Sequence, residues 1–497
     1  MKIERILIED QMAPIGLDEK KPAFSWLLTA EEGEQNLMQS ACRIVVRTGE
    51  DTVWDSGKME TGVSTGIGYE GEALQPCTKY EVKAEVWDNH GGKAEAESSF
   101  ETGLMDSLYA AWEGAEWIGA PHATVCAENR GVFTIESEFR MEGGKGEAGI
   151  VFGANDFRLN DHTKNELGME GENYIRYVVC LEDGDARLEI YRVGYAPEDT
   201  AEKPFAVTKL VNWKEKTQEI LTPENADAFH KLTVEVDGNV AYAYVDGILV
   251  DAIEEHGFFG TKVSGRQLNP RGNNDVLPYP RLNEIGFYAG KGTTGYFKNL
   301  TVRNVRKPSA EIVRETPEGR LDGGKSIFAD QIPVENGYFK VEDSQITADP
   351  SHHSIPMLRS CISCQKEKKL VSARLYITAR GIYDCRINGQ EITEDLLRPG
   401  LTQYDHRMNY QTYDITGLMK SGRNGIGVTL ASGWWSEAQT FVVKNFNYFG
   451  DKESLLAKVV MKYEDGSREV FGTNTEDWKY FGEGPYLFSS YFAGEQY

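Results

Sequence analysis

The sequence predicts an all-β protein made of three consecutive β-sandwich domains. Three observations predict this fold class. The chain has 497 residues, which is the length of roughly three domains of ordinary size. Short segments of alternating apolar and polar residues recur along it and end at turn-forming residues. Long amphipathic helical patterns are nearly absent, which argues against the parallel α/β folds that carry nucleotide cofactors.

The first domain is predicted from a clear strand at residues 80–87, Tyr-Glu-Val-Lys-Ala-Glu-Val-Trp. Alternate side chains of this segment fall on one face of a strand. Residues 88–92 break the strand with Asp, Asn, His and two glycines, and a last strand ends near Gly103. This spacing is typical of an immunoglobulin-like or fibronectin type III sandwich over residues 1–107.

The second domain, residues 113–306, contains the clearest hairpin. Strands at 232–236 and 240–245 are joined by Asp237-Gly238, and Asp246-Gly247 follows the second strand. The Asp-Gly pair suits the positive φ angles of two-residue hairpin turns. An alternating run at 295–302 would return the chain to the sheet. Together these segments resemble a large concanavalin- or laminin-G-like lectin sandwich, in which loops at one end commonly hold sugar and calcium.

The third domain follows a polar stretch at 306–326, which has two prolines, a glycine pair and no apolar period, and which we interpret as a linker. Residues 373–378 and 383–387 read as strands, and Asn388-Gly389 closes the second of them with a hairpin signal. Residues 327–497 therefore predict a third sandwich, a galactose-binding-like jelly roll.

Charge and composition exclude several partners. The chain has 53 Lys and Arg against 78 Asp and Glu, a formal net charge of -25, which repels nucleic acid and anionic membrane surfaces. No apolar run is long enough for a signal peptide or a membrane helix, so we expect a cytoplasmic protein. Seven scattered cysteines indicate buried free thiols. Cys361 and Cys364 form a C-x-x-C, but no second Cys or His pair follows at metal spacing.

Several phrases in order are similar to the N-terminal half of bacterial α-L-rhamnosidases. In the first domain they are residues 14–17 (Pro-Ile-Gly-Leu), 22–26 (Pro-Ala-Phe-Ser-Trp), 54–57 (Trp-Asp-Ser-Gly) and 100–104 (Phe-Glu-Thr-Gly-Leu), followed by 117–119 (Trp-Ile-Gly). In the third they are 373–377, 380–383, 387–389, 398–400, 410–416 and 433–435. We interpret Trp26, Trp54 and Trp87 as packing residues, and leave open whether Trp434 or Trp435 faces solvent, sugar or another domain.

The resemblance implies that this chain is part of a rhamnose-cleaving enzyme but lacks the domain that cleaves the sugar. In that family an (α/α) barrel follows the jelly roll and removes terminal α-L-rhamnose with inversion. Inversion needs a general acid and a general base roughly 6.5–9.5 Å apart, and the positions that would match them are not in this sequence, so no catalytic residue is assigned. The chain is expected to supply carbohydrate-binding and structural domains, with the barrel as its partner.

The second domain resembles the rhamnose-binding module inserted in some of these enzymes, where calcium bridges protein and L-rhamnose. The resemblance places calcium and sugar ligands at Asn155 and Asp156. A second loop, residues 271–278, is as rich in oxygen donors and could face the first, which makes Asp275 a candidate metal ligand. Arg158 could donate to sugar hydroxyls or pair with Asp161. Calcium takes 6–8 oxygen ligands, which such side chains and sugar hydroxyls supply. The other interpretation is that these Asn and Asp residues only form turns.

Two other functions stay open at this stage. The chain could be a free-standing lectin of three sandwiches that binds rhamnose-type sugars, or a complete enzyme of unknown mechanism, although the usual nucleotide-binding, nucleophile-elbow and zinc-protease motifs are missing. Reading the gene past Tyr497 separates these possibilities. A continuing frame with helical periodicity indicates the rhamnosidase, and a stop codon favours the lectin.

Overall fold

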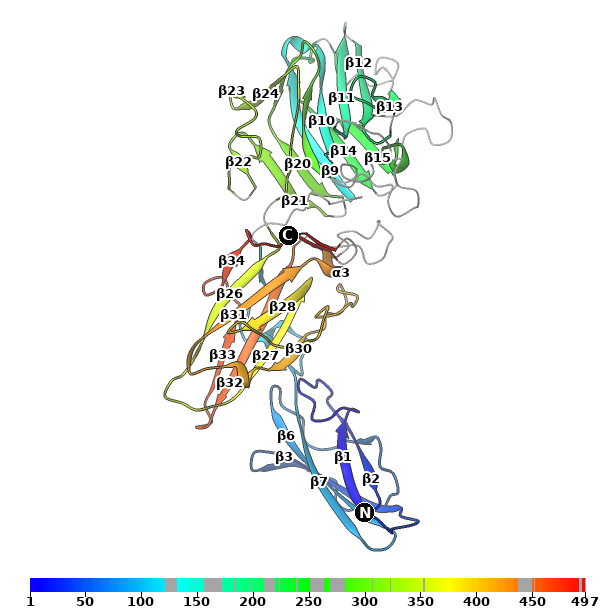
Figure 1. The fold of residues 1–497 in the computed structure, drawn as a ribbon, viewed down its shortest axis with the longest axis vertical. Coiled ribbons are helices and arrows are strands. Elements are labelled where there is room, and N and C mark those ends of the chain that lie inside the picture. The colour runs from blue at the N-terminus through cyan, green and yellow to red at the C-terminus, as the bar shows by residue number, and fades with distance from the viewer. Residues whose placement is uncertain are drawn as a thin grey trace.

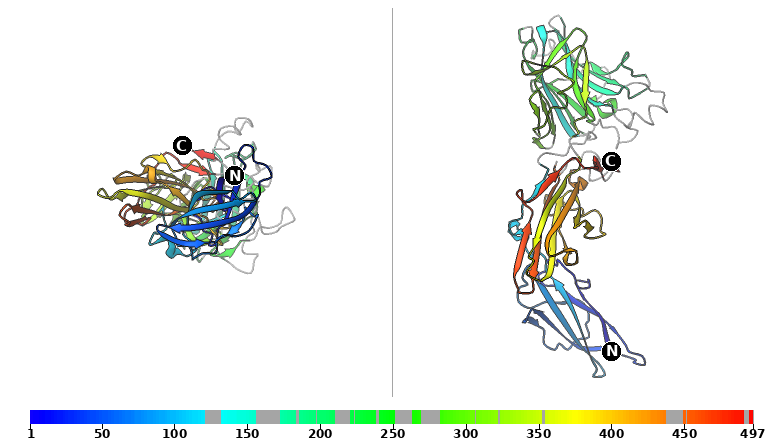
Figure 2. Two further views of the ribbon diagram at one scale, coloured as in Figure 1. Left: turned by 90° about the horizontal axis from the view of Figure 1, so that it is seen from below. Right: turned by 60° about the vertical axis from the view of Figure 1, so that its left-hand side comes forward.

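The computed structural model confirms an all-β protein built from antiparallel sheets. It describes the chain except residues 121–131, 156–171, 183–184, 197, 210–219, 223, 238–239, 251–262, 269–281, 306, 322, 352–353, 437–448, 451, 491–493 and 497. Three β-units follow one another along the long axis, and the third unit in chain order lies between the first and the second (Figures 1 and 2). No helix in the described part of the chain is long and apolar enough to cross a membrane.

The first unit, residues 1–107, packs the sheet β1-β2-β5 against the sheet β4-β3-β6-β7. Phe24, Trp26, Tyr80 and Phe100 are buried between the two sheets. Trp54 stacks on Phe24 with ring centroids 5.8 Å apart, so the aromatic phrases noted in the sequence form this core. The strands are β1 (Lys2–Ile8), β2 (Ala23–Thr29), β3 (Gln39–Thr48), β4 (Asp51–Asp55), β5 (Ile67–Gly68), β6 (Lys79–Asp88) and β7 (Lys93–Glu101).

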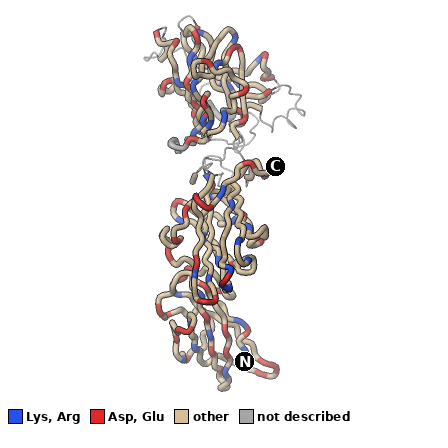
Figure 3. Tube along the Cα trace, turned by 90° about the vertical axis from the view of Figure 1, so that its left-hand side faces the viewer, with Lys and Arg blue, Asp and Glu red and all other residues tan. Residues whose placement is uncertain are grey.

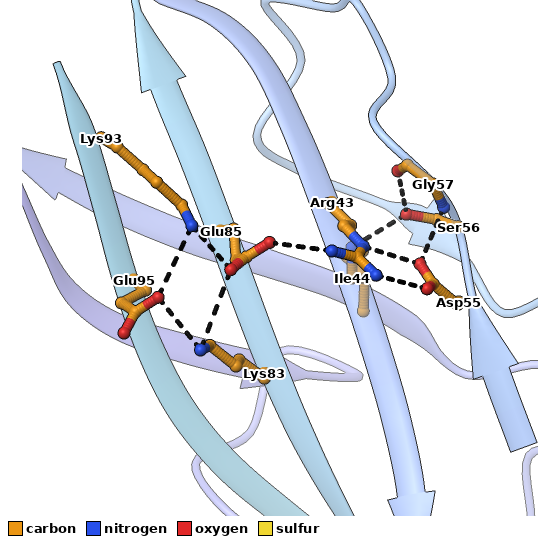
Figure 4. Close-up of polar contacts among 9 residues, drawn as sticks. All are labelled: Arg43, Ile44, Asp55, Ser56, Gly57, Lys83, Glu85, Lys93 and Glu95. Carbon is orange, nitrogen blue, oxygen red and sulfur yellow. Dashed lines mark hydrogen bonds and ion pairs between the residues drawn. The ribbon is translucent and has the colours of Figure 1, made fainter. Parts of the chain in front are cut away.

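The outward face of the β4-β3-β6-β7 sheet carries charges of alternating sign across its strands (Figure 4). Arg43 contacts Asp55 at 2.5 Å on one side and Glu85 at 3.5 Å on the other. Glu85 in turn accepts from Lys93 at 2.7 Å, and Lys83 lies 3.8 Å from it. Cross-strand pairs of this kind stabilise a solvated sheet face modestly. Charges of both signs are spread in this way over all three units (Figure 3).

The second unit consists of two sheets around the largest apolar core of the chain. We call the sheet β13-β12-β11-β10-β18-β25 the β11 sheet, and the sheet containing β16-β15-β14-β9-β19-β24-β23, with β17 and β20–β22 attached, the β14 sheet. Phe287 lies at the centre of the core, with ring centroids 4.5 Å from Phe297 and 5.5 Å from Phe339. Helix α2 (Gly265–Leu268) and the 3-10 turn η2 (Glu142–Gly144) lie in this unit.

The strands of the second unit are β9 (Val132–Met141), β10 (Gly146–Ala154), β11 (Tyr174–Glu182), β12 (Asp185–Val193), β13 (Phe205–Lys209), β14 (His230–Asp237), β15 (Val240–Val245), β16 (Ile248–Leu249), β17 (Val263–Ser264), β18 (Glu284–Ala289), β19 (Thr294–Phe297), β20 (Leu300–Asn304), β21 (Lys307–Thr316), β22 (Gly319–Arg320), β23 (Val334–Glu335), β24 (Tyr338–Glu342) and β25 (Gln345–Ala348).

The boundary between the second and third units differs from the expected one. Residues 307–316, expected in a linker, form β21 and pair with β20. Residues 338–348, expected in the third sandwich, form β24 and β25, which pair with β19 and β18 of the second unit. Phe328 and Phe339 are buried in the core of the second unit, which holds these strands there. The second unit therefore continues to residue 348.

The third unit, residues 354–496, is again a pair of antiparallel sheets, β29-β28-β31-β26-β34 and β30-β27-β32-β33. Its strands are β26 (Met357–Cys364), β27 (Leu370–Arg380), β28 (Ile382–Ile387), β29 (Gln390–Glu391), β30 (Gln411–Asp414), β31 (Gly422–Ala431), β32 (Ser454–Tyr463), β33 (Arg468–Gly472), β34 (Lys479–Phe481), β35 (Phe488–Ser490) and β36 (Gly494–Gln496), with η5 (Thr416–Leu418) and α3 (Gly433–Ser436). A strand from before the second unit, β8 (Ile118–Gly119), pairs with β32.

Two of the three predicted hairpin turns are confirmed. Asn388 and Gly389 have φ of 51° and 83°, and Asp246 and Gly247 have φ of 52° and 78°, as two-residue turns require. At the third, Gly238 lies outside the described residues, while Asp237 pairs with Val240 as the turn predicts. The described cysteines are all free thiols, as expected.

The first and third units meet through the segment that leaves β7. Leu104 and Trp112, from this segment and the 3-10 turn η1 (Tyr109–Trp112), pack with Tyr376 and Leu456 of the third unit in a small apolar cluster. Beside it, Arg374 on β27 donates two hydrogen bonds to Glu101 on β7, at 2.6 and 2.7 Å. Apolar packing and a paired charge therefore hold the two units together.

Candidate functional site

The predicted residue Asn155 lies at the end of β10, in the turn that leaves the β11 sheet. Its φ is 52°, a left-handed conformation that asparagine tolerates better than most residues. Its backbone N–H donates to the carbonyl oxygen of Asn173 at 3.0 Å. Its side-chain Nδ2 donates to Oε2 of Glu284 at 2.8 Å. Because Nδ2 faces Glu284, Oδ1 is directed elsewhere, and no described residue donates to it.

Buried hydrogen bonds hold the backbone on either side of Asn155. The carbonyl oxygen of Gly153 accepts from Asn173 Nδ2 at 2.8 Å and from the Tyr195 hydroxyl at 2.9 Å. Glu284, at the start of β18, also accepts from Thr347 Oγ1 at 2.7 Å. The amide and the carboxylate are thus both fixed at this end of the sheet before any ligand binds.

The other predicted site residues, Asp156, Arg158 and Asp275, lie outside the described residues. Among the described ones, no group of three or more His, Cys, Asp or Glu side chains has the arrangement of a metal site. Asn155 and Glu284 alone supply two oxygen-bearing groups of the kind that Ca²⁺ prefers. Calcium binding at this turn stays a prediction.

Next to Asn155, the β11 sheet turns a tyrosine-rich face away from the core. Ile175 and Tyr177 of β11 are buried in the core, so their neighbours Tyr174 and Arg176 lie on the opposite face. Arg176 is paired across the strands with Val151 of β10 and with Tyr191 of β12. Tyr174, Val151, Ala154 and Val193 form a separate small cluster with Tyr288 packed against it.

The guanidinium of Arg176 lies over the aromatic rings of this face. Its Cζ atom is 3.8 Å from the ring centroid of Tyr288, 5.3 Å from that of Tyr191 and 5.6 Å from that of Tyr174. On β10, Val151 pairs with Arg176 and Gly149, which has no side chain, pairs with Tyr288, so the arginine can reach across this strand to the Tyr288 ring. Stacking of this kind attracts the cation electrostatically and fixes its plane.

Arg176 has no hydrogen bond or ion pair with any described residue, and its Nε is buried without a partner. The carboxylates nearby are engaged elsewhere: Glu189 accepts from Arg187 at 2.6 Å, and Glu147 lies 3.3 Å from the Tyr288 hydroxyl. Burial without a partner costs a donor roughly 1–3 kcal/mol. The guanidinium is therefore held by stacking, and its terminal nitrogens, rather than the buried Nε, are the donors that could reach an oxygen-bearing ligand.

Burial keeps the surrounding phenols neutral. It raises the pKa of Tyr174, of Tyr191 and of Tyr288 above the ordinary value of 10. The face therefore presents one permanent cation, three neutral aromatic rings and hydroxyl groups. Aromatic faces stack on the C–H faces of sugars, and a guanidinium fork donates to their hydroxyls, so the chemistry suits a carbohydrate.

Sequence reasoning did not assign a role to the residues of this face. Residues 174–177 read Tyr-Ile-Arg-Tyr, and their alternation in a strand would have placed Tyr174 and Arg176 on one side. Tyr191, Tyr288 and Glu284 could not be joined to them, because only the pairing of the strands brings these residues together. In the third unit, Trp435 stacks on Phe449 with ring centroids 6.2 Å apart and lies at a tilt to Tyr404, with ring centroids 5.8 Å apart.

Two segments match models of known domains. Residues 3–106 match the Rha78A-like N-terminal immunoglobulin domain. Residues 368–497 match the α-L-rhamnosidase N-terminal domain. Over these segments the chain is similar to the N-terminal region of α-L-rhamnosidases. The chain is 26% identical over 500 residues to an α-L-rhamnosidase of Streptomyces avermitilis, covering 99% of this chain and 42% of that protein.

A second relative and a solved structure are similar to parts or all of the chain. An α-L-rhamnosidase of Formosa agariphila is 38% identical over 130 residues, which is 26% of this chain and 14% of that protein. The crystal structure of the Streptomyces avermitilis α-L-rhamnosidase complexed with L-rhamnose aligns with a TM-score of 0.52 at 20% identity, covering 99% of this chain and 42% of that one. The chain thus spans less than half the length of its Streptomyces relative.

Proposed function

We propose that this chain is the carbohydrate-binding and structural part of an α-L-rhamnosidase, whose catalytic barrel removes terminal α-L-rhamnose from glycosides with inversion. The observation that carries the binding role is the unpaired guanidinium of Arg176, stacked among three tyrosines next to Asn155. The match of the first and third units to rhamnosidase domains supports the family, and the site supports the division of labour between binding and cleavage.

We propose further that the second unit binds L-rhamnose, with calcium bridging the sugar and the Asn155 turn. Asn155 offers Oδ1, and Asp156 follows it directly in the sequence. Arg176 and the tyrosines then contact the part of the ligand that lies over the sheet. A carboxylate and an amide oxygen on one cation leave coordination positions that vicinal hydroxyls can fill.

Titration of L-rhamnose into the full chain tests this proposal. We expect a Kd in the millimolar range or just below, roughly -4 to -6 kcal/mol. EDTA and Asp156→Ala should both abolish binding, since each removes the bridging cation, and Asn155→Ala should weaken it. Arg176→Ala should weaken binding about tenfold, while Arg359→Ala, an exposed arginine on β26 of the third unit, should leave it unchanged.

Two outcomes would contradict the proposal. Equal affinity in EDTA and in Asp156→Ala would exclude the calcium bridge and return the Asn155 turn to an ordinary structural role. Unchanged affinity in Arg176→Ala would exclude the tyrosine-rich face as the binding surface.

An activity assay tests the division of labour between binding and cleavage. The chain alone should not hydrolyse an aryl α-L-rhamnoside. Turnover comparable to that of a form extended by a barrel would overturn the proposal that cleavage requires the barrel.

A further inference from the structure

A cavity of about 600 Å³ lies where the first and third units meet. Its size falls within the range of small-ligand sites, which form preferentially between domains. Tyr109 and Trp112 of η1, Trp117, and Tyr410 of the third unit give it an aromatic lining. The lining also includes Asp18 and Lys20 of the first unit, Thr378 and Leu456 of the third, Asp106 and Ser107 of the connecting segment, and the run 406–408.

The walls of this junction cavity are fixed by hydrogen bonds between the two units. The Tyr410 hydroxyl donates to Asp18 at 2.7 Å and accepts from the backbone N–H of Leu104 at 2.7 Å. Lys458, buried in β32, donates to the carbonyl oxygen of Ala111 at 2.7 Å and so holds η1 against the third unit. The cavity therefore requires both units and is formed before a ligand arrives.

The carboxylates of the lining already have partners within the protein. Asp18 accepts from Tyr410 and from the backbone N–H of Met105, and Asp106 accepts from the backbone N–H of Leu108 at 2.9 Å. Both carboxylates thus accept hydrogen bonds from backbone N–H groups of the connecting segment. Neither carboxylate forms an ion pair with a described cation.

The basic side chains of the lining, unlike the carboxylates, have no partners among the described residues. Lys20, His406 and Arg407 make no side-chain hydrogen bond or ion pair with any described residue. The loop that carries Arg407 is nonetheless held in place, because its backbone N–H donates to Gln403 at 2.8 Å and its carbonyl accepts from the Thr402 hydroxyl. Although the chain as a whole has a net charge of -25, the unpaired cations Lys20 and Arg407 give this aromatic cavity a local site for an anion.

We propose that the junction cavity binds an acidic oligosaccharide, a short glycan that carries a uronic acid carboxylate. The exposed ring of Tyr109, with Trp112 and Trp117 behind it, stacks on the C–H faces of pyranose rings. Arg407 and Lys20 pair with the carboxylate. The inference does not depend on rhamnose binding by the second unit, and it adds a second sugar site to the chain.

Titration of a galacturonic acid trimer into the full chain tests the inference, with a neutral galactose trimer in parallel. The acidic trimer should bind at least fivefold more tightly than the neutral one, and raising NaCl from 50 to 500 mM should weaken it, since salt screens exposed charges. Arg407→Ala and Tyr109→Ala should each weaken binding at least fivefold. Both side chains are exposed, so neither substitution endangers folding.

Two matched controls locate the binding. Arg359→Ala removes an equally exposed arginine from the same unit and should change the affinity less than twofold. Arg176→Ala alters the face of the second unit and should have no effect on the acidic trimer. Equal binding of the two trimers, no binding of either, or loss of binding in Arg176→Ala with retention in Arg407→Ala would each overturn the inference.

Discussion

Removing Arg374 should loosen the first unit from the third. Its guanidinium donates to both carboxylate oxygens of Glu101, and it also contacts Asp414 at 2.7 Å. The side chains of Arg374 and Glu101 are only 13% and 16% exposed. Truncating one partner of a fully buried pair costs about 3–5 kcal/mol. Since both are slightly exposed, we expect about 2–3 kcal/mol for Arg374→Ala.

Thermal unfolding measures this cost. For a unit of this size, 1 kcal/mol shifts the midpoint by roughly 2–4 °C, so the transition of the joined first and third units should fall by about 5–10 °C. A double-mutant cycle with Glu101→Ala isolates the pair, and its coupling energy should be about 2 kcal/mol. The transition of the second unit, which lacks this contact, should stay where it is.

A matched control exists on the outward face of the first unit. Arg43 binds Asp55 with the same two-point geometry, at 2.8 and 2.5 Å, but both side chains are 39% exposed. Exposed pairs contribute roughly 0.2–1 kcal/mol. If Arg374→Ala shifts the midpoint no more than Arg43→Ala, or if the Arg374 and Glu101 effects simply add, the buried pair does not join the units and the reasoning is wrong.

Three further predictions follow from single residues. Hydrogen bonding to Arg468, aided by Lys458, lowers the pKa of Glu113 from 4.5 to about 2, so its stabilisation is present above pH 4.5 and lost as the pH falls towards 2; the gap in melting temperature between wild type and Glu113→Gln should close over that window. Burial raises the pKa of Cys385 to about 12, so iodoacetamide at pH 8 should label the partly exposed Cys361 first, and equal rates would refute this. Gly149→Ala would push a Cβ into the backbone of β11 and should destabilise the second unit by more than about 2 kcal/mol in urea unfolding, whereas Gly425→Ala meets open space and should not.

The sequence predicted the elements that local chemistry determines. Asn388-Gly389 and Asp246-Gly247 each join two strands through a two-residue turn with positive φ angles. Asn-Gly and Asp-Gly favour this conformation, so both hairpin turns could be predicted from the sequence alone. Phe24 and Trp26 lie two residues apart in β2 and are both buried, in agreement with the interpretation of Trp26 as a packing residue. The fold class followed from many such signals, none of which depends on residues far away in the chain.

The sequence could not predict features that depend on pairing between distant strands. Residues 306–326 are polar, with two prolines, a glycine pair and no apolar period, so the sequence predicted a linker. Pairing with β20 nonetheless makes residues 307–316 a strand. The tyrosines around Arg176 come from β11, β12 and β18, whose neighbourhood only the sheet order reveals. Asn155 lies in a turn, but its partner Glu284 is 129 residues further along the chain and could not be found from the sequence.

Because β8 pairs with β32, the strand β8 is synthesised long before the third unit to which it belongs can be completed. Ile118 and Gly119 must wait for Leu455 and Ser454, and the entire second unit is synthesised in between. At about 5–20 residues per second, that delay is on the order of half a minute on the ribosome. The second unit therefore has time to fold as a closed loop of chain while β8 is still an unpaired edge. A segment inserted in this way can be lengthened, exchanged or lost in evolution without changing the order of strands in its host, provided that its two ends stay close together.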